Sequence, residues 1–329
     1  MIIFFWLPGT SGTNPINKMI VKTLSPPLFD LEDPKWLEYY EQYGFSVIQN
    51  ILEPSRKEEI YNEFKDDLLT VSPNFDFEDN SSWIIENTPT IFSKGVAVFN
   101  GFGQSNFIWS LRTEPKIQEI FKRIYKCNDL VTSLDGFSLF VSKNQKSSPW
   151  LHIDQNPHNE TYSVQGQYNF KPVNNEDAGF IVIPESHKDF NPIVKNMKDW
   201  YVLKNEEIES FPNEPVKLLM PENCFTIWNS RTVHANTHIV TNKSRNLTDI
   251  NRVTAYVAFL PEELRTEDIK RERINAYMNG ETTSHWANKC EIKKYPWGFG
   301  PTYEKRGFGR ILPKLSSSGE IPNERFKLL

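Results

Sequence analysis

The chain has little cysteine, no excess of positive charge and no long hydrophobic run. Its three cysteines, Cys127, Cys224 and Cys290, lie far apart in 329 residues, and that spacing builds neither a disulfide framework nor a zinc ribbon. A reducing compartment is the natural environment for such a chain, so we expect a cytoplasmic protein. The formal net charge of −5 gives no reason to expect a nucleic-acid or anionic-membrane partner. No segment has the length of a membrane span.

The first seven residues are apolar, but we expect an N-terminal extension there rather than a secretory signal. The run ends at Pro8 and has no Lys or Arg before it, whereas a signal needs a positive region, a longer apolar stretch and a cleavage site. The composition, with 38% hydrophobic and 13% aromatic residues, is that of a globular protein. We expect residues 1–30 to be an N-terminal extension, 31–290 a single domain and 291–329 a C-terminal tail.

Helical patterns dominate the early part of the domain, from about residue 34 to 126. Ser55-x-x-Glu58 matches a capping box and precedes apolar residues at helical spacing, which predicts a helix over 55–69. Apolar stripes of this kind are typical of core packing. The other expected helices are 34–43, ended by Gly44; 115–126, with Pro115 in its first turn; and a charged helix over 262–278.

From about residue 131 to 261 the pattern changes to short β-branched or aromatic runs bounded by Pro, Asn or Gly. Such runs predict strands. Many short strands at irregular spacing are typical of a sandwich or a jelly-roll barrel. We therefore expect a mainly β fold with flanking helices. The clearest strands are 137–141, 164–170, 179–183, 224–228 and 253–259.

One short motif in this region has the residue types of a metal site. His152-Ile153-Asp154 places an imidazole and a carboxylate two residues apart, and residues i and i+2 of a strand point to the same face. With one more histidine, the set becomes the two-histidine, one-carboxylate face that binds ferrous iron and leaves positions open. Alone, a His-x-Asp motif arises by chance in about one such chain in four.

The third ligand has two candidates, His234 and His238, in a strand-like segment after Trp228. The pair at i and i+4 resembles the zinc-protease pattern, but Ala235 stands where that pattern requires a glutamate. In a strand both histidines share a face. We favour His234 and leave His238 open.

A cation for a ligand carboxylate is expected from Arg252. It opens the strand that continues to Phe259, and Thr254 lies on the same face by the two-residue period. A guanidinium at this place can pair with a carboxylate through two hydrogen bonds. Arg245 is a rival in a polar, loop-like run, and a surface salt bridge is the alternative role of Arg252.

The ordered set of these elements resembles the phytanoyl-CoA dioxygenase-like family of iron(II)- and 2-oxoglutarate-dependent oxygenases. Further similarity, to an uncharacterised branch of that family, extends the resemblance over roughly residues 40 to 290. Glu185 departs from the family pattern, which has glycine before Ser-His. The segments that carry the resemblance are His152-x-Asp154, Pro184 to His187, Trp228 to His234, Arg252, Gln165-Gly166, Gly101-Phe-Gly103, Trp109 to Arg112 and Thr283 to Trp286.

The resemblance implies a double-stranded β-helix (jelly-roll, cupin-like) in which His152, Asp154 and His234 bind Fe(II). Arg252, with Thr254 beside it, would bind the distal carboxylate of 2-oxoglutarate. The implied reaction is hydroxylation of a small-molecule or lipid-like substrate by dioxygen, with release of succinate and CO2. Asp154 favours a hydroxylase over the related halogenases, which have a small residue there.

Some alternatives stay open. A metal-binding barrel with isomerase-like chemistry, or a non-catalytic binding protein, is the competing interpretation, although an isomerase has no need for the Arg252 carboxylate clamp. His187 is expected to bond the main chain, His158 to lie at the surface or pocket rim, and His285 has some chance of lining the pocket entrance. The sequence indicates neither the substrate nor the oligomeric state.

Overall fold

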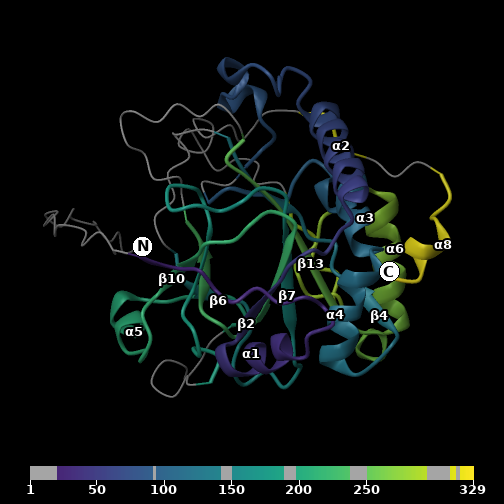
Figure 1. The fold of residues 1–329 in the computed structure, drawn as a ribbon. Helices are drawn as coiled ribbons and strands as arrows, with labels where there is room; N and C mark the ends of the chain where they lie inside the picture. The colour runs from purple at the N-terminus through teal and green to yellow at the C-terminus, as the bar shows by residue number, and fades with distance from the viewer. Residues whose placement is uncertain are drawn as a thin grey trace, which may run out of the picture.

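Two β-sheets and a set of flanking helices make up the protein in the computed structural model (Figure 1). The structure describes residues 21–91, 94–141, 150–188, 198–237, 250–294, 312–315 and 319–329.

The first sheet has six strands, and its neighbours pair antiparallel except for the parallel edge pair β1 and β10. Two of its central strands, β12 and β6, each contain one of the histidines predicted to bind metal. Its order is β1 (Lys22–Leu24), β10 (Val216–Leu218), β8 (Phe180–Val182), β12 (His234–Asn236), β6 (His152–Ile153) and β9 (Tyr201–Val202).

The second sheet has seven strands, all paired antiparallel. Its long strand β13 contains Arg252 and Thr254. The order is β2 (Phe45–Ile48), β11 (Cys224–Asn229), β7 (Val164–Asn169), β13 (Arg252–Pro261), β5 (Phe137–Phe140) and β3 (Val96–Ala97), with β4 (Leu130–Thr132) also paired to β13.

The two sheets pack face to face. A buried apolar cluster joins Phe45 of β2 and Trp228 of β11 to Phe180 and Val182 of β8. The intervening Ile181 belongs to a separate cluster on the other face of the six-stranded sheet. Alternate residues of β8 therefore face opposite sides, as the pleat requires. The expected mainly β, jelly-roll fold is confirmed.

Helices cover the other face of the seven-stranded sheet (Figure 1). Val253, Ala255 and Val257 of β13 pack against these helices in the main core. Because side chains alternate along a strand, Arg252 and Thr254 point to the opposite face, between the two sheets. Helix α5 (Asn205–Glu209) packs instead on the six-stranded sheet. The other helices are α1 (Lys35–Tyr43), α2 (Pro54–Val71), α3 (Asn106–Arg112), α4 (Pro115–Tyr125), α6 (Glu267–Met278) and α8 (Asn323–Phe326), and the 3-10 turns are η1 (Asn80–Ser82), η2 (Ile85–Asn87), η3 (Phe102–Gln104) and η4 (Glu262–Leu264).

The helix predictions are confirmed in position and corrected at two starts. Helix α1 ends as expected at Gly44, whose φ of 80° is left-handed and whose N–H donates to Tyr40 O. The capping box at Ser55 is wrong: α2 begins at Pro54 with no side-chain cap, because proline has no N–H to satisfy and suits the first position. The helix expected over 262–278 begins at Glu267, after a cap by Thr266.

Both ends of the described chain contact the body of the protein. Strand β1 pairs with β10, and Leu328 and Leu329 are buried in the main core. The predicted boundaries at residues 30 and 290 stay predictions. Among the described residues, no helix has the length and apolar character needed to cross a membrane.

Candidate metal centre

Strand pairing brings the two predicted histidine ligands together. His234 of β12 and His152 of β6 are direct partners in antiparallel register, and directly opposed residues point to the same face of a sheet. Their ring centroids lie 4.3 Å apart. About eighty residues separate the two histidines in the sequence, and the pairing of β6 with β12 makes them neighbours in space.

Asp154 completes the group. It follows β6 and is positioned by its own N–H, which donates to Ser230 O at 3.0 Å. Its Oδ1 lies 3.7 Å from His152 Nε2 and its Oδ2 lies 3.2 Å from His234 Nε2. One ligand atom from each residue lies within 4.8 Å of the other two. Metal–ligand bonds of about 2.0–2.2 Å place ligand atoms about this far apart, so the three residues fit a divalent ion.

Both imidazoles are oriented by the main chain. His152 Nδ1 is 3.0 Å from Trp150 O and His234 Nδ1 is 2.8 Å from Thr232 O. A carbonyl accepts only from a protonated Nδ1, which leaves the Nε2 lone pair free for a metal. The Trp150 indole also stacks on His152, with ring centroids 4.0 Å apart. Each ring is therefore held in a ligand tautomer and a fixed orientation.

Burial and mutual charge set the protonation of the group. Burial, then the nearby His234, lowers the pKa of His152 to about 3. Burial opposes ionisation of Asp154, but the histidines beside it hold the pKa of this carboxyl well below its ordinary value. A neutral imidazole and an ionised carboxylate at physiological pH are the forms that bind a metal.

A hydrogen-bonded glutamine supports the carboxylate. Gln165 Nε2 donates to Asp154 Oδ2 at 3.0 Å and to Ser230 Oγ at 3.2 Å. The next residue is Gly166. A Cβ added there would lie 2.3 Å from the Phe225 ring, so the close approach of that ring requires glycine. The Gln165-Gly166 pair was part of the sequence resemblance, but its role in holding Asp154 was not predicted.

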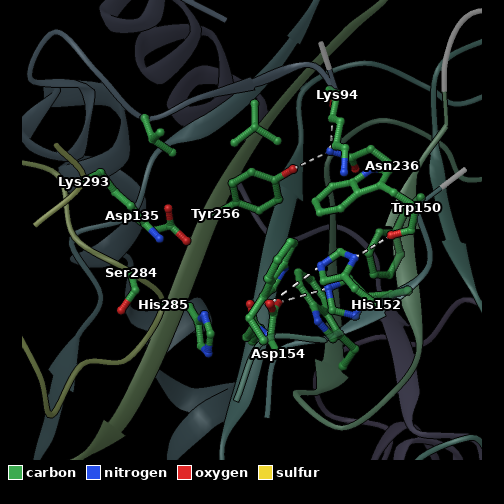
Figure 2. Close-up of a pocket in the computed structure, with 17 residues that line it drawn as sticks. Lys94, Asp135, Trp150, His152, Asp154, Asn236, Tyr256, Ser284, His285 and Lys293 are labelled. Atoms are coloured by element: carbon green, nitrogen blue, oxygen red, sulfur yellow. Dashed lines mark hydrogen bonds and ion pairs between the residues drawn. The ribbon is translucent and has the colours of Figure 1, made fainter. Parts of the chain in front are cut away.

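A cavity of about 660 Å³ opens beside the three residues. Aromatic side chains form much of its wall, and polar side chains gather at two places (Figure 2). One polar group, Lys94 with Asn236 and Tyr256, lies beyond Trp150; the other contains Asp135, Ser284 and His285. The aromatic residues are Trp150, Phe180, Trp200, Trp228 and Tyr256.

Arg252 lies between the sheets but does not itself line the cavity. It is 1% exposed, its Nε donates to Thr254 Oγ1 at 3.0 Å, and its terminal nitrogens donate to Gly179 O, Asn236 Oδ1 and Gln167 Oε1 at 2.9, 2.8 and 3.1 Å. Burial lowers the pKa of Arg252 to about 10.

The Arg252 charge is buried among neutral acceptors. Within the described parts of the chain no carboxylate forms an ion pair with it, and the adjacent Gln167 Nε2 is buried without a hydrogen-bond partner. Asn236 separates the guanidinium from the cavity, because Asn236 both lines the cavity and accepts from Arg252. The predicted shared face of Arg252 and Thr254 is confirmed by their hydrogen bond.

The other described histidines differ in whether they line the cavity. His187 Nε2 lies 3.1 Å from Glu41 O, and neither His187 nor His158 lines the cavity. His285 lines the cavity, which was one of the positions considered for it from the sequence. Glu185, where the family pattern has glycine, has a φ of 65°, a left-handed conformation that glycine adopts without strain. His238 and Arg245, the alternative ligand and alternative clamp, lie outside the described residues.

Several cavity residues were not singled out from the sequence. Asn236 and Tyr256 lie two residues after His234 and four after Arg252, so the strand period places them on the inner face. The sequence therefore contained a signal for these two residues. Lys94 and Asp135 come from segments with no motif, and only the tertiary structure identifies them.

Comparisons with known proteins find one family and two relatives over most of the chain. The model of the Phytanoyl-CoA dioxygenase (PhyH) family matches residues 40–247. "Ava biosynthesis cluster protein O" of Aspergillus versicolor is 26% identical, over 70% of this chain and 79% of its own length. The "Putative phytanoyl-CoA dioxygenase" of Dictyostelium discoideum is 22% identical, over 79% of this chain and 83% of its own length.

A solved structure has a similar fold. The non-heme alpha ketoglutarate dependent carbocyclase SnoK from nogalamycin biosynthesis aligns over 72% of this chain and 87% of its own, with 13% identity and a TM-score of 0.52. At this identity the likeness supports the two-sheet fold and nothing finer.

Proposed function

The chain belongs to the phytanoyl-CoA dioxygenase family, and from that premise we propose that it is an Fe(II)- and 2-oxoglutarate-dependent hydroxylase of a small-molecule or lipid-like substrate, releasing succinate and CO2. The observation that carries the proposal is the cross-strand pair His152 and His234 with Asp154 beside the cavity. The name of the Aspergillus versicolor relative refers to a biosynthesis cluster, which favours a small-molecule substrate.

In this proposal His152 Nε2, His234 Nε2 and an Asp154 oxygen hold the iron. With three protein ligands, a bound ion would keep positions open for the cosubstrate. When bound, the iron and 2-oxoglutarate supply the oxidising power for hydroxylation of an unactivated C–H bond. The chain contributes the ligand geometry: the main-chain carbonyls hold both rings and Gln165 holds the carboxylate.

The distal carboxylate of 2-oxoglutarate is proposed to bind Arg252, with Thr254 as its neighbour. The support is electrostatic, since a guanidinium buried among neutral acceptors is costly unless an anion pairs with it. Gln167 Nε2, buried without a partner beside it, is a further donor. The carboxylate would replace the Asn236 Oδ1 acceptor that now stands between Arg252 and the cavity.

The remaining wall of the cavity is largely aromatic. Phe180, Trp200 and Trp228 present apolar surface to the cavity, and a low-dielectric site strengthens every polar interaction inside it. The chain therefore offers an aromatic pocket next to the ligands, in which a substrate would lie with its reacting carbon toward His152, Asp154 and His234.

The test is anaerobic addition of Fe(II) and 2-oxoglutarate to the purified protein. We expect the visible charge-transfer band of the iron–2-oxoglutarate chelate, and slow succinate formation when air is admitted. Absence of both would refute the proposal. Metal binding without the band would instead favour a metal-binding barrel with non-oxidative chemistry.

A further inference from the structure

The cavity has a second polar wall that the iron site does not use. Asp135 lies in the connection between β4 and β5, while Ser284 and His285 follow α6. All three line the cavity, and Figure 2 shows them apart from His152 and Trp150, on the side of Lys293. Ser284 Oγ and His285 Nε2 are buried and have no hydrogen-bond partner. Unpaired buried polar atoms cost free energy unless a ligand pairs with them.

Arg112 connects the segments that form this wall. It is fully buried, and its terminal nitrogens donate to Gly103 O at 2.6 Å and to Asp135 O at 2.9 Å. Gly103 N–H donates in turn to Thr282 Oγ1 at 2.9 Å. A Cβ at Gly103 would lie 2.5 Å from Leu134 O, so the close approach of these segments requires glycine.

Further hydrogen bonds tie the Ser284 segment to the same frame. Thr283 N–H donates to Leu134 O at 2.8 Å. Gln104 Nε2 donates to Glu281 O at 2.6 Å and its Oε1 accepts from Trp109 Nε1 at 3.0 Å. The sequence segments 101–103, 109–112 and 283–286, which contribute no iron ligand, thus build one frame around Asp135, Ser284 and His285. Such support holds a binding group in place before the ligand arrives.

The charges that face the wall restrict the ligand. A cationic group would meet Lys293 beside this wall, and Lys94 and the proposed iron elsewhere in the cavity. An anionic group would meet Asp135 and the Asp154 carboxylate, which both line the cavity, and one Asp135 oxygen already accepts from Gly136 N–H at 2.7 Å. Like charges in a low-dielectric cavity repel strongly. A neutral group with hydrogens to donate suits the wall best, and a hydroxyl both donates and accepts.

The rest of the cavity suits an apolar ring. Trp150, Trp200 and Phe180 line it together with Val96 and Val98, and aromatic faces favour stacked or edge-on contact with another ring. We propose that Asp135, Ser284 and His285 form a substrate subsite that binds the hydroxyl of a neutral molecule with an apolar ring body. Such a molecule would be the substrate class of the proposed hydroxylase. Its binding does not depend on the proposed function, whereas its hydroxylation does.

Four probes with one ring and different side groups test the subsite: indole-3-ethanol, 3-ethylindole, tryptamine and indole-3-acetate. Ligand-observed NMR titrations use the full-length chain, with and without Zn(II) and 2-oxoglutarate. We expect indole-3-ethanol to bind most tightly of the four. Ser284→Ala and Asp135→Asn should each reduce its advantage over 3-ethylindole by about three- to tenfold, the effect of one hydrogen bond.

Glu291→Gln is the matched control, because Glu291 is exposed on the same segment and does not line the cavity. It should leave the preference unchanged, and the unfolding temperature of each variant checks that it folds. No binding of indole-3-ethanol, equal or tighter binding of a charged probe, or a preference that survives both variants overturns the subsite. The metal-free titrations separate the two proposals, since a missing chelate band with intact hydroxyl preference refutes the function alone.

Discussion

Single residues near the metal centre are held by the main chain as much as by one another. His152 and His234 each contact the carbonyl two residues earlier, so the strand itself selects the tautomer that leaves Nε2 free. His187 is the contrasting case, a half-buried histidine that bonds Glu41 O away from the cavity. The sequence motifs favoured His152 and His234 over His187 as ligands, and the positions of the three histidines in the fold agree with that distinction.

His234→Ala should abolish tight Fe(II) binding, because it removes one of three protein ligands. His187→Ala is the control and should retain wild-type binding. Anaerobic titration with Fe(II), followed by metal analysis after desalting, measures both. Equal retention by the two variants would show that His234 is not a ligand and would direct attention to His238.

Arg252→Lys should weaken 2-oxoglutarate binding about ten- to a hundredfold, since an ammonium keeps the charge but loses the two-point contact. Arg231→Lys is a suitable control, because Arg231 NH2 donates to Asn159 O and does not line the cavity. Titration of the anaerobic iron protein with 2-oxoglutarate gives both affinities. An unchanged affinity in Arg252→Lys would contradict the clamp and leave Arg245 as its candidate.

At the scale of elements, the helices were predictable in position because their apolar periodicity is local. Their exact starts were not, as Pro54 and Thr266 show. One contact between elements has a thermodynamic consequence. Asp67 of α2 accepts from Phe107 N–H at 3.1 Å and from Asn106 Nδ2 at 3.3 Å at the start of α3. Burial nevertheless raises its pKa from 3.8 to about 6.

The raised pKa makes folding favour protonated Asp67. The part of the free energy of unfolding that comes from protonated Asp67 is therefore fully present below about pH 4 and is lost as the pH rises through about 6. Asp67→Asn, which keeps an acceptor for Phe107 N–H, should remove this loss, on the order of 2 kcal/mol. Urea unfolding at pH 4 and pH 7.5 measures it. Asp66→Asn, at an exposed neighbour, should keep the wild-type pH dependence.

At the scale of the whole molecule, the metal centre joins separate parts of one sheet and faces the other. His152, Asp154 and His234 link β6 to β12, and Gln165 of β7 in the second sheet bonds Asp154. The frame around Arg112 brings residues near 103, 135 and 282 together on the far side of the cavity. Ligands bound between the sheets should therefore stabilise the entire fold.

Fe(II) with 2-oxoglutarate, each at about a hundred times its dissociation constant, should raise the unfolding temperature by about 10 °C. Ligand binding at that excess contributes about 2.7 kcal/mol for each site, and a chain of this size gains about 2 °C per kcal/mol. Anaerobic differential scanning calorimetry measures the shift. The same shift in His234→Ala would mean that the ligands stabilise the protein elsewhere.

The sequence by itself determined what short-range periodicity controls: the helices, the short strands, and the shared faces of His152 with Asp154 and of Arg252 with Thr254. Only the tertiary structure decided that His152 and His234 are direct strand partners, that Asn236 separates Arg252 from the cavity, and that Asp135 lies on the same wall as Ser284. The physical reason is that side-chain direction follows from the local backbone. Strand register and the docking of distant segments depend instead on contacts that exist only once both sheets have formed.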